Sequence, residues 1–349
     1  MKTPKGLFTG LLAAATVAAA GFAAPGYAAE ETITVHHFIS PKAPAHKSFI
    51  EPWARRVEEQ SNGRIEVKIF PAMSMGGKPP ELYRQVRDGA ADVVWTVIGY
   101  TPGVFPRSEV FELPTVHQGS ARATNLAIQE NFALLADDFK DLKPILIHAH
   151  AGNALHLRET AVRSVGDVKD MKLRTPSRTG AWMIESWNAE PVGMPLPALP
   201  QALSKGAVDG ALIPFEVVLP FKLQELTKYS VEGDTGGRFG TAVFLFAMNK
   251  DRYKSLPDDL KAVIDANSGD ALATEIGELW DGIEAPGKAA QEKSGGEVIK
   301  LDAATLADFD KLGEGVVARW IEDADSNGLD GQALVDAARA SVAKHSTAK

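Results

Sequence analysis

The stretch that decides the fold spans residues 164–216 and reads SVGDVKDMKLRTPSRTGAWMIESWNAEPVGMPLPALPQALSKGAVDGALIPFE. It predicts a short strand over 171–174, which Pro176 ends, followed by a helix that contains residues 181–187. An extended run followed directly by a helical pattern is the beginning of a βαβ unit. The rest of the stretch shows whether that unit continues.

The same alternation repeats in the second half of the stretch. A strand over 191–194 precedes a short helix, and Gly206 ends that helix as a C-cap glycine. The apolar run 208–213 then predicts a buried strand. Strands that alternate with short helices predict a parallel sheet, and ligands of such sheets bind beyond the C-terminal ends of the strands. Arg174 lies at one such end, and the segment 213–215 lies at another.

An arginine at a strand end has a specific chemical use. Its guanidinium stays charged and can form two parallel hydrogen bonds to one carboxylate. Surface arginines that pair with a neighbouring acid are also common. The position of Arg174 in the sequence therefore leaves both interpretations open.

The mature chain resembles a known family along nearly its whole length, in motifs of which several span ten or more residues. The motifs are, in order, WARRVEEQSNGRIEVKIFP (53–71), GGKPPELYRQVRDGAADVVW (76–95), FELP (111–114), KLRTP (172–176), PVGMPLPALPQAL (191–203), KGAVDGALIP (205–214) and AMNKDRYKSLPDDLKAVI (247–264). Together they resemble the solute-binding proteins of tripartite ATP-independent periplasmic (TRAP) transporters, of the DctP type.

This resemblance implies an α/β, two-lobed periplasmic-binding-protein fold with a hinge and a long helix that spans both lobes. In the family, the arginine of a K-[IL]-R-[TV]-P motif binds the ligand carboxylate, and here that arginine is Arg174. The implied function is that of a receptor that captures a small organic acid and delivers it to membrane permease subunits. The implied receptor has no cofactor and no turnover of its own.

The chain is expected to divide into a signal peptide over 1–28, a first lobe over 29–153 with a return near 239–275, a second lobe over 154–238, and a helical C-terminal region over 258–349 that packs on both lobes. The helical pattern over 258–294 is expected to form the long helix of the family.

The first 28 residues predict export to the periplasm. Lys2 and Lys5 precede an apolar run over 7–22, and the small residues of 26–28 offer a cleavage site. A membrane anchor is the alternative, but the apolar run is shorter than the roughly 20 residues that a bilayer span needs.

Composition narrows the remaining functions. The formal net charge is −8, and loss of the two leader lysines makes it −10, which argues against nucleic acid or an anionic membrane as a partner. The absence of cysteine excludes disulfides and thiolate chemistry. A mature chain of about 320 residues favours two domains, and we expect a monomer.

Metal binding and catalysis are both disfavoured. The histidines that could supply imidazole ligands are His36, His37, His148, His150 and His156. They lie on at least three predicted elements, and no carboxylate stands beside them at a helical ligand spacing. Some relatives hold their ligand through a cation bound by an acid after the Asp-Gly strand, but the equivalent residues here are Leu212 and Ile213. We therefore expect no metal, and Glu216 lies past the predicted site.

Enzyme motifs are also missing from the sequence. It contains neither a G-x-S-x-G elbow nor an H-E-x-x-H helix, and its glycine pairs do not follow the dinucleotide pattern. We expect a binding protein and no enzyme. A sensory receptor of the same fold and, less favoured, a secreted lyase or hydrolase are the alternatives.

The residues expected around the ligand favour an apolar body. Sugar-acid-binding relatives tend to place polar side chains at positions that are Val97 and Ile213 here, and Leu196 stands where phenylalanine is common. A hydroxyl-rich ligand would lose hydrogen bonds at such positions, whereas an aromatic body would gain from burial. C4-dicarboxylates and sugar acids remain the alternative ligands.

Many relatives carry a second arginine about twenty residues before the first, and Ala154 occupies that position here. One arginine favours a monocarboxylate, whose shell Asn153 or His156 would complete. The aromatic residues available to pack on the ligand could equally belong to the cores of the lobes. The expected site residues are Arg174, Asn153, Trp95, Phe38, Tyr100, His156, Ile213, Pro214 and Phe215.

Overall fold

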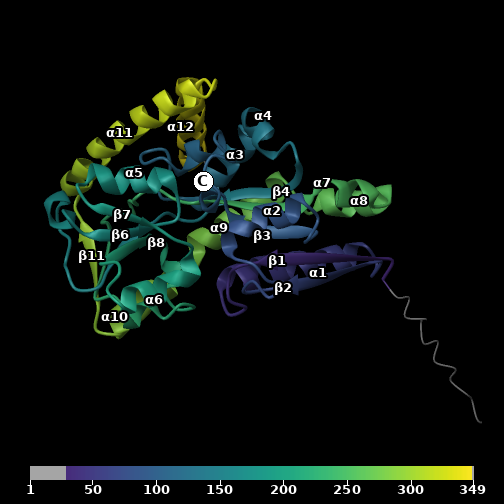
Figure 1. The fold of residues 1–349 in the computed structure, drawn as a ribbon, viewed down its shortest axis with the longest axis horizontal. Helices are drawn as coiled ribbons and strands as arrows, with labels where there is room; N and C mark the ends of the chain where they lie inside the picture. The colour runs from purple at the N-terminus through teal and green to yellow at the C-terminus, as the bar shows by residue number, and fades with distance from the viewer. Residues whose placement is uncertain (1–28, 348–349) are drawn as a thin grey trace, which may run out of the picture.

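Two β-sheets organise the molecule into two lobes in the computed structural model, which describes residues 29–347 (Figure 1). The predicted signal peptide over 1–28 lies outside the described residues. Within them, no helix combines the length and the apolar character that a membrane span requires. The α/β, two-lobed architecture predicted from the sequence is confirmed.

The first lobe is built on a five-stranded mixed sheet with the order β2-β1-β3-β10-β4. Its strands are β1 (Glu31–His37), β2 (Ile65–Phe70), β3 (Val93–Val97), β4 (Leu142–Ala149) and β10 (Val243–Asn249). Strand β1 pairs in parallel with β2 and β3, whereas β10 runs antiparallel to β3 and β4. The strand over 243–249 therefore returns the chain to the first sheet after it has built most of the second.

Helices surround the first sheet. They are a π-helical turn (Ala45–Ile50) that continues as α1 (Glu51–Gln60), α2 (Leu82–Arg87), α3 (Ala121–Glu130), α4 (Phe132–Leu135), α7 (Lys250–Ser255), α8 (Asp258–Ala266) and α9 (Asp270–Gly282). Helix α9 packs on α3 and on β4. The inner face of α1 is buried, and Trp53 and Val57 on it are fully shielded from solvent.

The second lobe is built on a six-stranded sheet with the order β11-β9-β5-β8-β6-β7. Its strands are β5 (Ala154–Leu157), β6 (Lys172–Thr175), β7 (Glu190–Gly193), β8 (Gly210–Ile213), β9 (Tyr229–Gly233) and β11 (Glu297–Leu301). Strand β6 pairs in parallel with both β7 and β8, as the stretch over 164–216 predicts. Strand β5 runs antiparallel to β8 and β9.

The predicted βαβαβ unit is confirmed, with helices α5 (Arg178–Ser186) and α6 (Leu199–Ser204) between its strands. Gly206 follows α6 with a φ of +67°, a conformation that glycine adopts without the steric cost of a Cβ atom. Strands β6 and β8 of this unit are parallel neighbours. Arg174 and Ile213 therefore lie at the same, C-terminal end of the two strands.

The prediction of one long helix over 258–294 is wrong. That region forms α8, α9 and α10 (Ala285–Lys293). Gly269 separates the first two with a φ of +72°, and Pro286 starts the third because a proline cannot continue a helix interior. The long helix of the chain is α11 (Ala303–Ser326), which has 24 residues.

The C-terminal part of the chain packs on both lobes through three helices, which are α10, α11 and α12 (Gly331–Thr347). Helix α10 packs on β11 of the second sheet, and α11 packs on α5. Helix α12 then turns back onto α3 of the first lobe, so the yellow C-terminal helices in Figure 1 extend across the top of the molecule.

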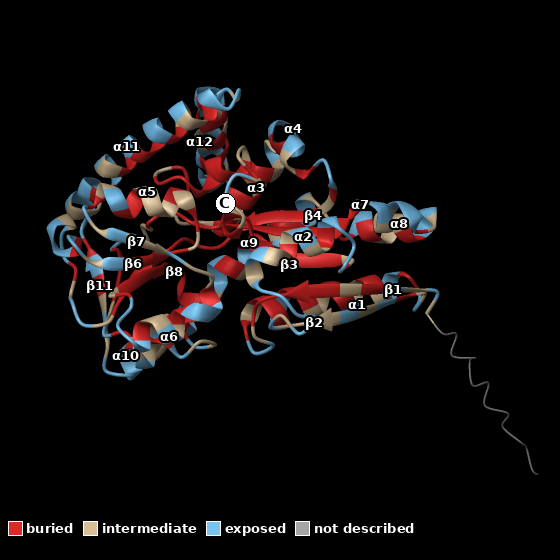
Figure 2. Cartoon of the chain, viewed as in Figure 1, coloured by how far each residue is buried: buried red, intermediate tan, exposed pale blue. Residues whose placement is uncertain are grey.

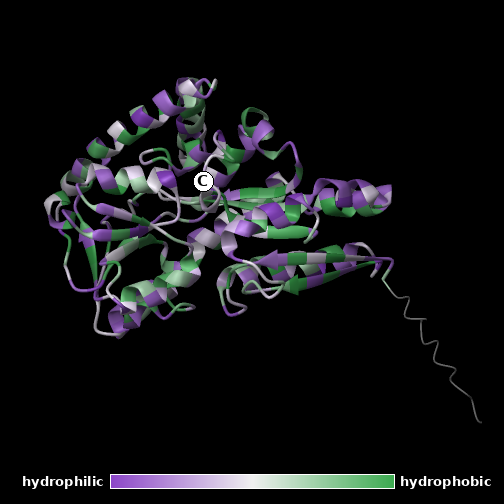
Figure 3. Ribbon diagram, in the orientation of Figure 1, coloured by the Kyte–Doolittle hydropathy of each residue, from purple (hydrophilic) through white to green (hydrophobic). Residues whose placement is uncertain are grey.

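Each lobe has its own aromatic cluster within the buried interior that Figure 2 shows in red. The clusters are Phe49, Trp53 and Phe246 in the first lobe and Trp187, Phe239 and Phe309 in the second. The strands carry most of the hydrophobic colour in Figure 3, whereas the outer faces of α8 and α11 are hydrophilic. Apolar burial of this kind supplies most of the folding free energy.

Buried ion pairs link the segments that connect the two lobes. Arg238, on the segment that leads from β9 to β10, donates to Glu284 at 2.8 Å and also pairs with Glu232. Glu284, between α9 and α10, accepts a hydrogen bond from the Phe215 N–H at 2.9 Å. The crossing segments are therefore bonded both to each other and to the end of β8.

A close helix contact in the first lobe gives a test of this packing. A Cβ atom at Gly277 of α9 would lie 2.4 Å from the Cα atom of Arg122 on α3. We expect Gly277→Ala to force the two helices apart and to lower the free energy of unfolding by about 1–3 kcal/mol, measured by chemical denaturation. Gly315→Ala, on α11 with open space around it, is the matched control and should raise stability by up to about 1 kcal/mol. Equal stability of the two variants would contradict the packing.

Candidate functional site

A cavity lies between the lobes. The ends of β1 and β3 and the turn before α1 contribute its first-lobe wall, and the ends of β6 and β8 contribute its second-lobe wall. This is the location expected for a ligand beyond the C-terminal ends of parallel strands. Of the nine predicted site residues, those that line this cavity are Phe38, Trp95, Tyr100, Asn153, Arg174, Ile213 and Pro214.

The first-lobe wall is a stack of aromatic rings. The Trp95 ring lies between Phe38 and Phe244, with ring centroids 5.2 and 4.7 Å away and interplanar angles of 11° and 9°. The Trp95 indole N–H donates to Nε2 of His148 at 2.9 Å, which fixes the rotation of the indole. Stacked, mutually held rings form a rigid apolar wall of the cavity.

Aliphatic side chains fill Val97 and Ile213, where sugar-acid-binding relatives tend to be polar, and Leu196, where phenylalanine is common. Val97, Leu196 and Ile213 all line the cavity and are at most 7% exposed. Burial in the cavity therefore favours apolar ligand surface over hydroxyl groups at these three positions.

Arg174 is the charged group of the cavity, and it is only 3% exposed. Its Nε–H donates to the Met194 carbonyl at 2.9 Å and an Nη1–H donates to the Leu212 carbonyl at 3.2 Å. Within residues 29–347 no carboxylate forms an ion pair with it. Burial lowers the pKa of Arg174 below its ordinary value, while the adjacent Tyr100 opposes this change.

A buried guanidinium with two of its donors used and no anion beside it is energetically incomplete. Removing such a charge from water costs several kcal/mol unless a counter-charge and further hydrogen bonds replace the lost hydration. Its remaining N–H groups match the two oxygens of a carboxylate. The geometry can therefore hold one carboxylate at the Arg174 end of the cavity.

Three further polar groups line the cavity. The Tyr100 hydroxyl accepts from the Leu196 N–H at 2.9 Å. Both ring nitrogens of His150 lie near backbone N–H groups, at 3.0 and 3.2 Å, and burial holds its pKa well below the ordinary value, so the ring is neutral. The Asn153 Nδ2 donates to the Phe239 carbonyl at 3.4 Å, and its Oδ1 has no hydrogen-bond partner within the described chain.

Two predicted site residues, His156 and Phe215, lie outside the cavity lining. His156 is two residues further along β5 than Ala154, away from the strand end that meets the cleft, and its Nδ1 hydrogen-bonds Ser230 Oγ at 2.9 Å. The Phe215 ring packs against His156 and beneath Lys288, with centroid distances of 4.9 and 5.0 Å. The chain leaves β8 in the helical turn Phe215–Val217, and in that turn Glu216 and Val217 line the cavity whereas Phe215 does not.

Glu216 is the residue that sequence reasoning placed past the site and the structure places in the cavity wall. No strand periodicity in the sequence predicts this position, because Glu216 lies in the helical turn Phe215–Val217 that follows β8. The residue is 8% exposed.

The histidines considered as metal ligands occupy separate environments. His37 Nε2 and His46 Nδ1 lie 2.9 Å apart, and His46 pairs with Glu51. Burial lowers the pKa of both His37 and His148 to about 3, so these two rings are neutral. Over the part of the chain that the structure describes, no group of three or more His, Asp or Glu side chains could hold a metal ion.

Close contacts join the lobes beside the cavity. Gly99 follows β3 in the first lobe, and a Cβ atom there would lie 2.6 Å from the Ser177 Cβ and 2.9 Å from the Pro176 carbonyl oxygen of the second lobe. The hydrogen bond between Tyr100 and Leu196 joins the lobes in the same region. The structure is therefore closed around the cavity.

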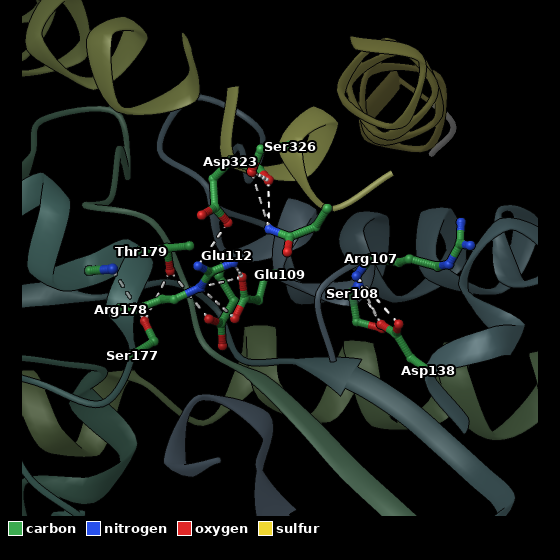
Figure 4. A network of polar contacts seen from close by, with 12 residues as sticks. Arg107, Ser108, Glu109, Glu112, Asp138, Ser177, Arg178, Thr179, Asp323 and Ser326 are labelled. Carbon is green, nitrogen blue, oxygen red and sulfur yellow. Dashed lines mark hydrogen bonds and ion pairs between the residues drawn. The ribbon is translucent and has the colours of Figure 1, made fainter. Parts of the chain in front are cut away.

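A polar network extends this contact away from the cavity (Figure 4). Arg178 of α5 pairs with Glu109 of the first lobe at 2.6 Å and with Asp323 of α11 at 2.8 Å. Near it, Glu112 accepts from the Val243 N–H at 2.9 Å and from the Thr179 hydroxyl at 3.3 Å.

Asp138 holds the start of the same first-lobe segment. It accepts from the backbone N–H groups of Arg107 and Ser108 at 3.0 and 2.8 Å. Burial raises the pKa of Asp138 to about 6, and these hydrogen bonds limit the rise. The segment that carries Glu109 and Glu112 is thus fixed before it meets the second lobe.

Comparison with known proteins gives a consistent result. A model of the family described as bacterial extracellular solute-binding protein, family 7 (DctP), matches residues 35–323. The outer membrane transporter protein TsaT of Comamonas testosteroni is 23% identical over 341 residues, which cover 95% of this chain and 97% of that protein.

Two solved structures are similar along most of their length. A TRAP solute-binding protein of an unidentified marine microbe, described as specific for aromatic acid ligands and solved with 3-hydroxybenzoate, is 44% identical with a TM-score of 0.88, covering 90% of this chain and 98% of that one. A TRAP solute-binding protein of Rhodoferax ferrireducens, solved with copurified benzoate, is 39% identical with a TM-score of 0.88 and the same coverage.

The protonation of Glu112 makes stability depend on pH. Burial raises the pKa of Glu112 from its ordinary value near 4.5 to about 8, so the folded protein keeps a proton that the unfolded chain releases. The free energy of unfolding should therefore fall as pH rises from about 4.5 to about 8, by up to about 1.4 kcal/mol per pH unit from this group.

Glu112→Gln has no such titration, so its stability relative to the natural protein should increase across that pH range. Thermal unfolding at a series of pH values measures the difference. Glu185→Gln, at a half-exposed surface ion pair, is the control. A difference between Glu112→Gln and the natural protein that does not change with pH would show that Glu112 is ionised in the folded state.

Proposed function

Because the chain belongs to bacterial extracellular solute-binding protein family 7, we propose that it is the periplasmic solute-binding subunit of a TRAP transporter and that its ligand is a monocarboxylate with an aromatic body. The observation that carries the proposal is the buried Arg174, which has no anionic partner in the described chain and shares its cavity with a wall of stacked rings. The protein would capture this acid without turnover and deliver it to membrane permease subunits.

The two parts of the ligand make separate contributions. A carboxylate at Arg174 supplies the missing counter-charge of the guanidinium. A phenyl ring that buries on the order of 100 Å² against Phe38, Trp95 and Phe244 would contribute roughly 2.5 kcal/mol at about 25 cal/mol per Å². A sugar acid of the same size would gain less and would leave hydroxyls unpaired beside Val97 and Ile213.

The number of arginines favours one carboxylate over two. Ala154, at the position of the second family arginine, is fully buried in β5 beside Ile213. Arg158 lies elsewhere, with its guanidinium beside Gly206 at the end of α6, and it is not part of the cavity lining. A C4-dicarboxylate would therefore have one carboxylate without a cationic partner.

The similar proteins support the same ligand class. The marine protein is described as specific for aromatic acids, and the Rhodoferax protein was solved with copurified benzoate. Both align with this chain over nine-tenths of its length.

The experiment that tests the proposed function is a thermal-shift screen of the natural protein. Benzoate, the hydroxybenzoates, a branched-chain acid, a C4-dicarboxylate and a hexuronate are compared at equal concentration. We expect the aromatic acids to give the largest rise in melting temperature, because a ligand that binds only the folded state stabilises it. Stabilisation by the dicarboxylate or the hexuronate alone would overturn the proposed ligand class and leave the family unchanged.

Arg174 gives the sharpest test of the binding mode. Arg174→Ala should weaken benzoate binding by roughly 3–5 kcal/mol, or more than 100-fold, because the ligand carboxylate would be buried without a counter-charge. Arg174→Lys should restore only part of the loss, since an ammonium group cannot form the paired contact. Titration calorimetry measures both variants, with Arg158→Ala as the matched control. Benzoate affinity close to normal in Arg174→Ala would refute the assignment.

Gly99 tests whether binding requires closure of the lobes. The added Cβ of Gly99→Ala would meet the backbone of Pro176 and Ser177 only when the lobes are closed. We expect roughly 10- to 100-fold weaker benzoate binding, from an overpacking cost of about 1–3 kcal/mol. Small-angle scattering should show that benzoate reduces the radius of gyration of the natural protein more than that of the variant.

The matched control for this variant is Gly193→Ala, since open space surrounds Gly193 on β7. Normal benzoate affinity in both variants would argue against the closed complex.

A further inference from the structure

The cavity lining contains a buried carboxyl group, Glu216, that a benzoate molecule does not need. Glu216 belongs to the helical turn Phe215–Val217 that follows β8, and it lines the cavity together with Val217. Its Oε2 is shielded from solvent and has no hydrogen-bond partner among residues 29–347. A shielded oxygen without a partner is costly, so a native structure that keeps one calls for an explanation.

The surroundings of Glu216 keep its carboxyl neutral. Burial raises its pKa well above the ordinary value, and the neighbouring Glu284 carboxylate raises it further. The nearby cations are already paired, because Arg238 binds Glu232 and Glu284, and Lys288 binds Glu232. The Trp280 indole lies beside the carboxyl, but its N–H does not complete a hydrogen bond.

Arg174 and Glu216 mark different parts of the cavity. They form no ion pair, and neither charge influences the pKa of the other. A carboxylate bound at Arg174 therefore leaves Glu216 to face the body of the ligand. A protonated carboxyl offers one O–H donor and a carbonyl acceptor, which is the pattern that a hydroxyl group can satisfy from both sides.

We propose that Glu216 is a specificity-determining residue that hydrogen-bonds a hydroxyl group on the ring of the bound acid. This inference rests on the proposed function and narrows its ligand class to hydroxylated aromatic acids. The unsubstituted acid would leave Glu216 without a partner, and a site built to bond a hydroxyl rejects the analogue that lacks it. The aliphatic side chains of Val97, Leu196 and Ile213 offer such a hydroxyl no hydrogen-bond partner.

Asn153 is the rival for this role, because it also lines the cavity and its buried Oδ1 has no partner in the described chain. It differs from Glu216 in having its Nδ2 bonded to the Phe239 carbonyl, which fixes the amide. The experiment therefore has to separate the two residues.

Titration calorimetry with benzoate and with 2-, 3- and 4-hydroxybenzoate tests the proposal on the full mature chain. The quantity of interest is the ratio of the benzoate Kd to the Kd of the best hydroxy isomer. We expect this ratio to be about tenfold or more in the natural protein and to fall to about one in Glu216→Leu. Glu216→Gln should keep most of the ratio, because an amide both donates and accepts. Val217→Ala, at the adjacent lining residue, should weaken both ligands alike and leave the ratio unchanged.

Several outcomes would overturn the proposal. One is a ratio in Glu216→Leu equal to that of the natural protein, and another is a ratio lost in Asn153→Leu but kept in Glu216→Leu. If Glu216→Leu does not fold, a comparison of two ligands on the natural protein still tests the proposal. The fluorobenzoate of the preferred isomer has nearly the same shape without a donor, and it should bind about tenfold more weakly than the hydroxybenzoate; equal affinity contradicts the proposal. Absence of binding by every benzoate would instead refute the proposed function itself.

Discussion

The constraint on which the site depends is a buried positive charge without a buried negative one. Arg174 is held by the carbonyls of Met194 and Leu212, whose oxygens orient the guanidinium but do not neutralise it. An isolated charge in such a place costs several kcal/mol. The second lobe can bear this cost because it has a buried hydrophobic core of its own, and the cost is removed when an anion enters. Part of the binding free energy therefore comes from relieving the cost of the buried, unneutralised Arg174 guanidinium.

This arrangement couples ligand binding to the closure of the two lobes. Arg174 comes from the second lobe and the stacked rings of Phe38 and Trp95 from the first, so one ligand can satisfy both only when the lobes meet. Gly99 permits that meeting, because only a residue without a side chain fits against the backbone of Pro176. A ligand shifts an equilibrium by the difference in its affinity for the two states. Here that difference comes from joining a charge on one lobe to a surface on the other.

Local patterns in the sequence predicted the parts of the site that depend on local structure. The βαβαβ unit over 164–216 follows from alternating strand and helix signals. It places Arg174 and Ile213 at the C-terminal ends of two neighbouring parallel strands. The structure places Glu216 in the cavity lining and Phe215 outside it, and these directions depend on how the chain leaves β8. The breaks in the helical region over 258–294 had signals in Gly269 and Pro286, but the family resemblance outweighed them. The unpaired state of Arg174 and of Glu216 depends on every side chain packed around them, and no local pattern contains that information.

The acidic surface of the protein bears on how selectivity arises. With a formal net charge of −8, the long-range field does not attract an organic anion, and physiological salt limits such fields to about 8 Å. Attraction therefore acts only within the cavity, where low polarity strengthens the contact between Arg174 and a carboxylate. An anion has to lose its water to reach that contact, and only a body that fits the stacked rings compensates for the loss. The charge selects carboxylates as a class, whereas the rings and the few polar groups beside them select one member of that class.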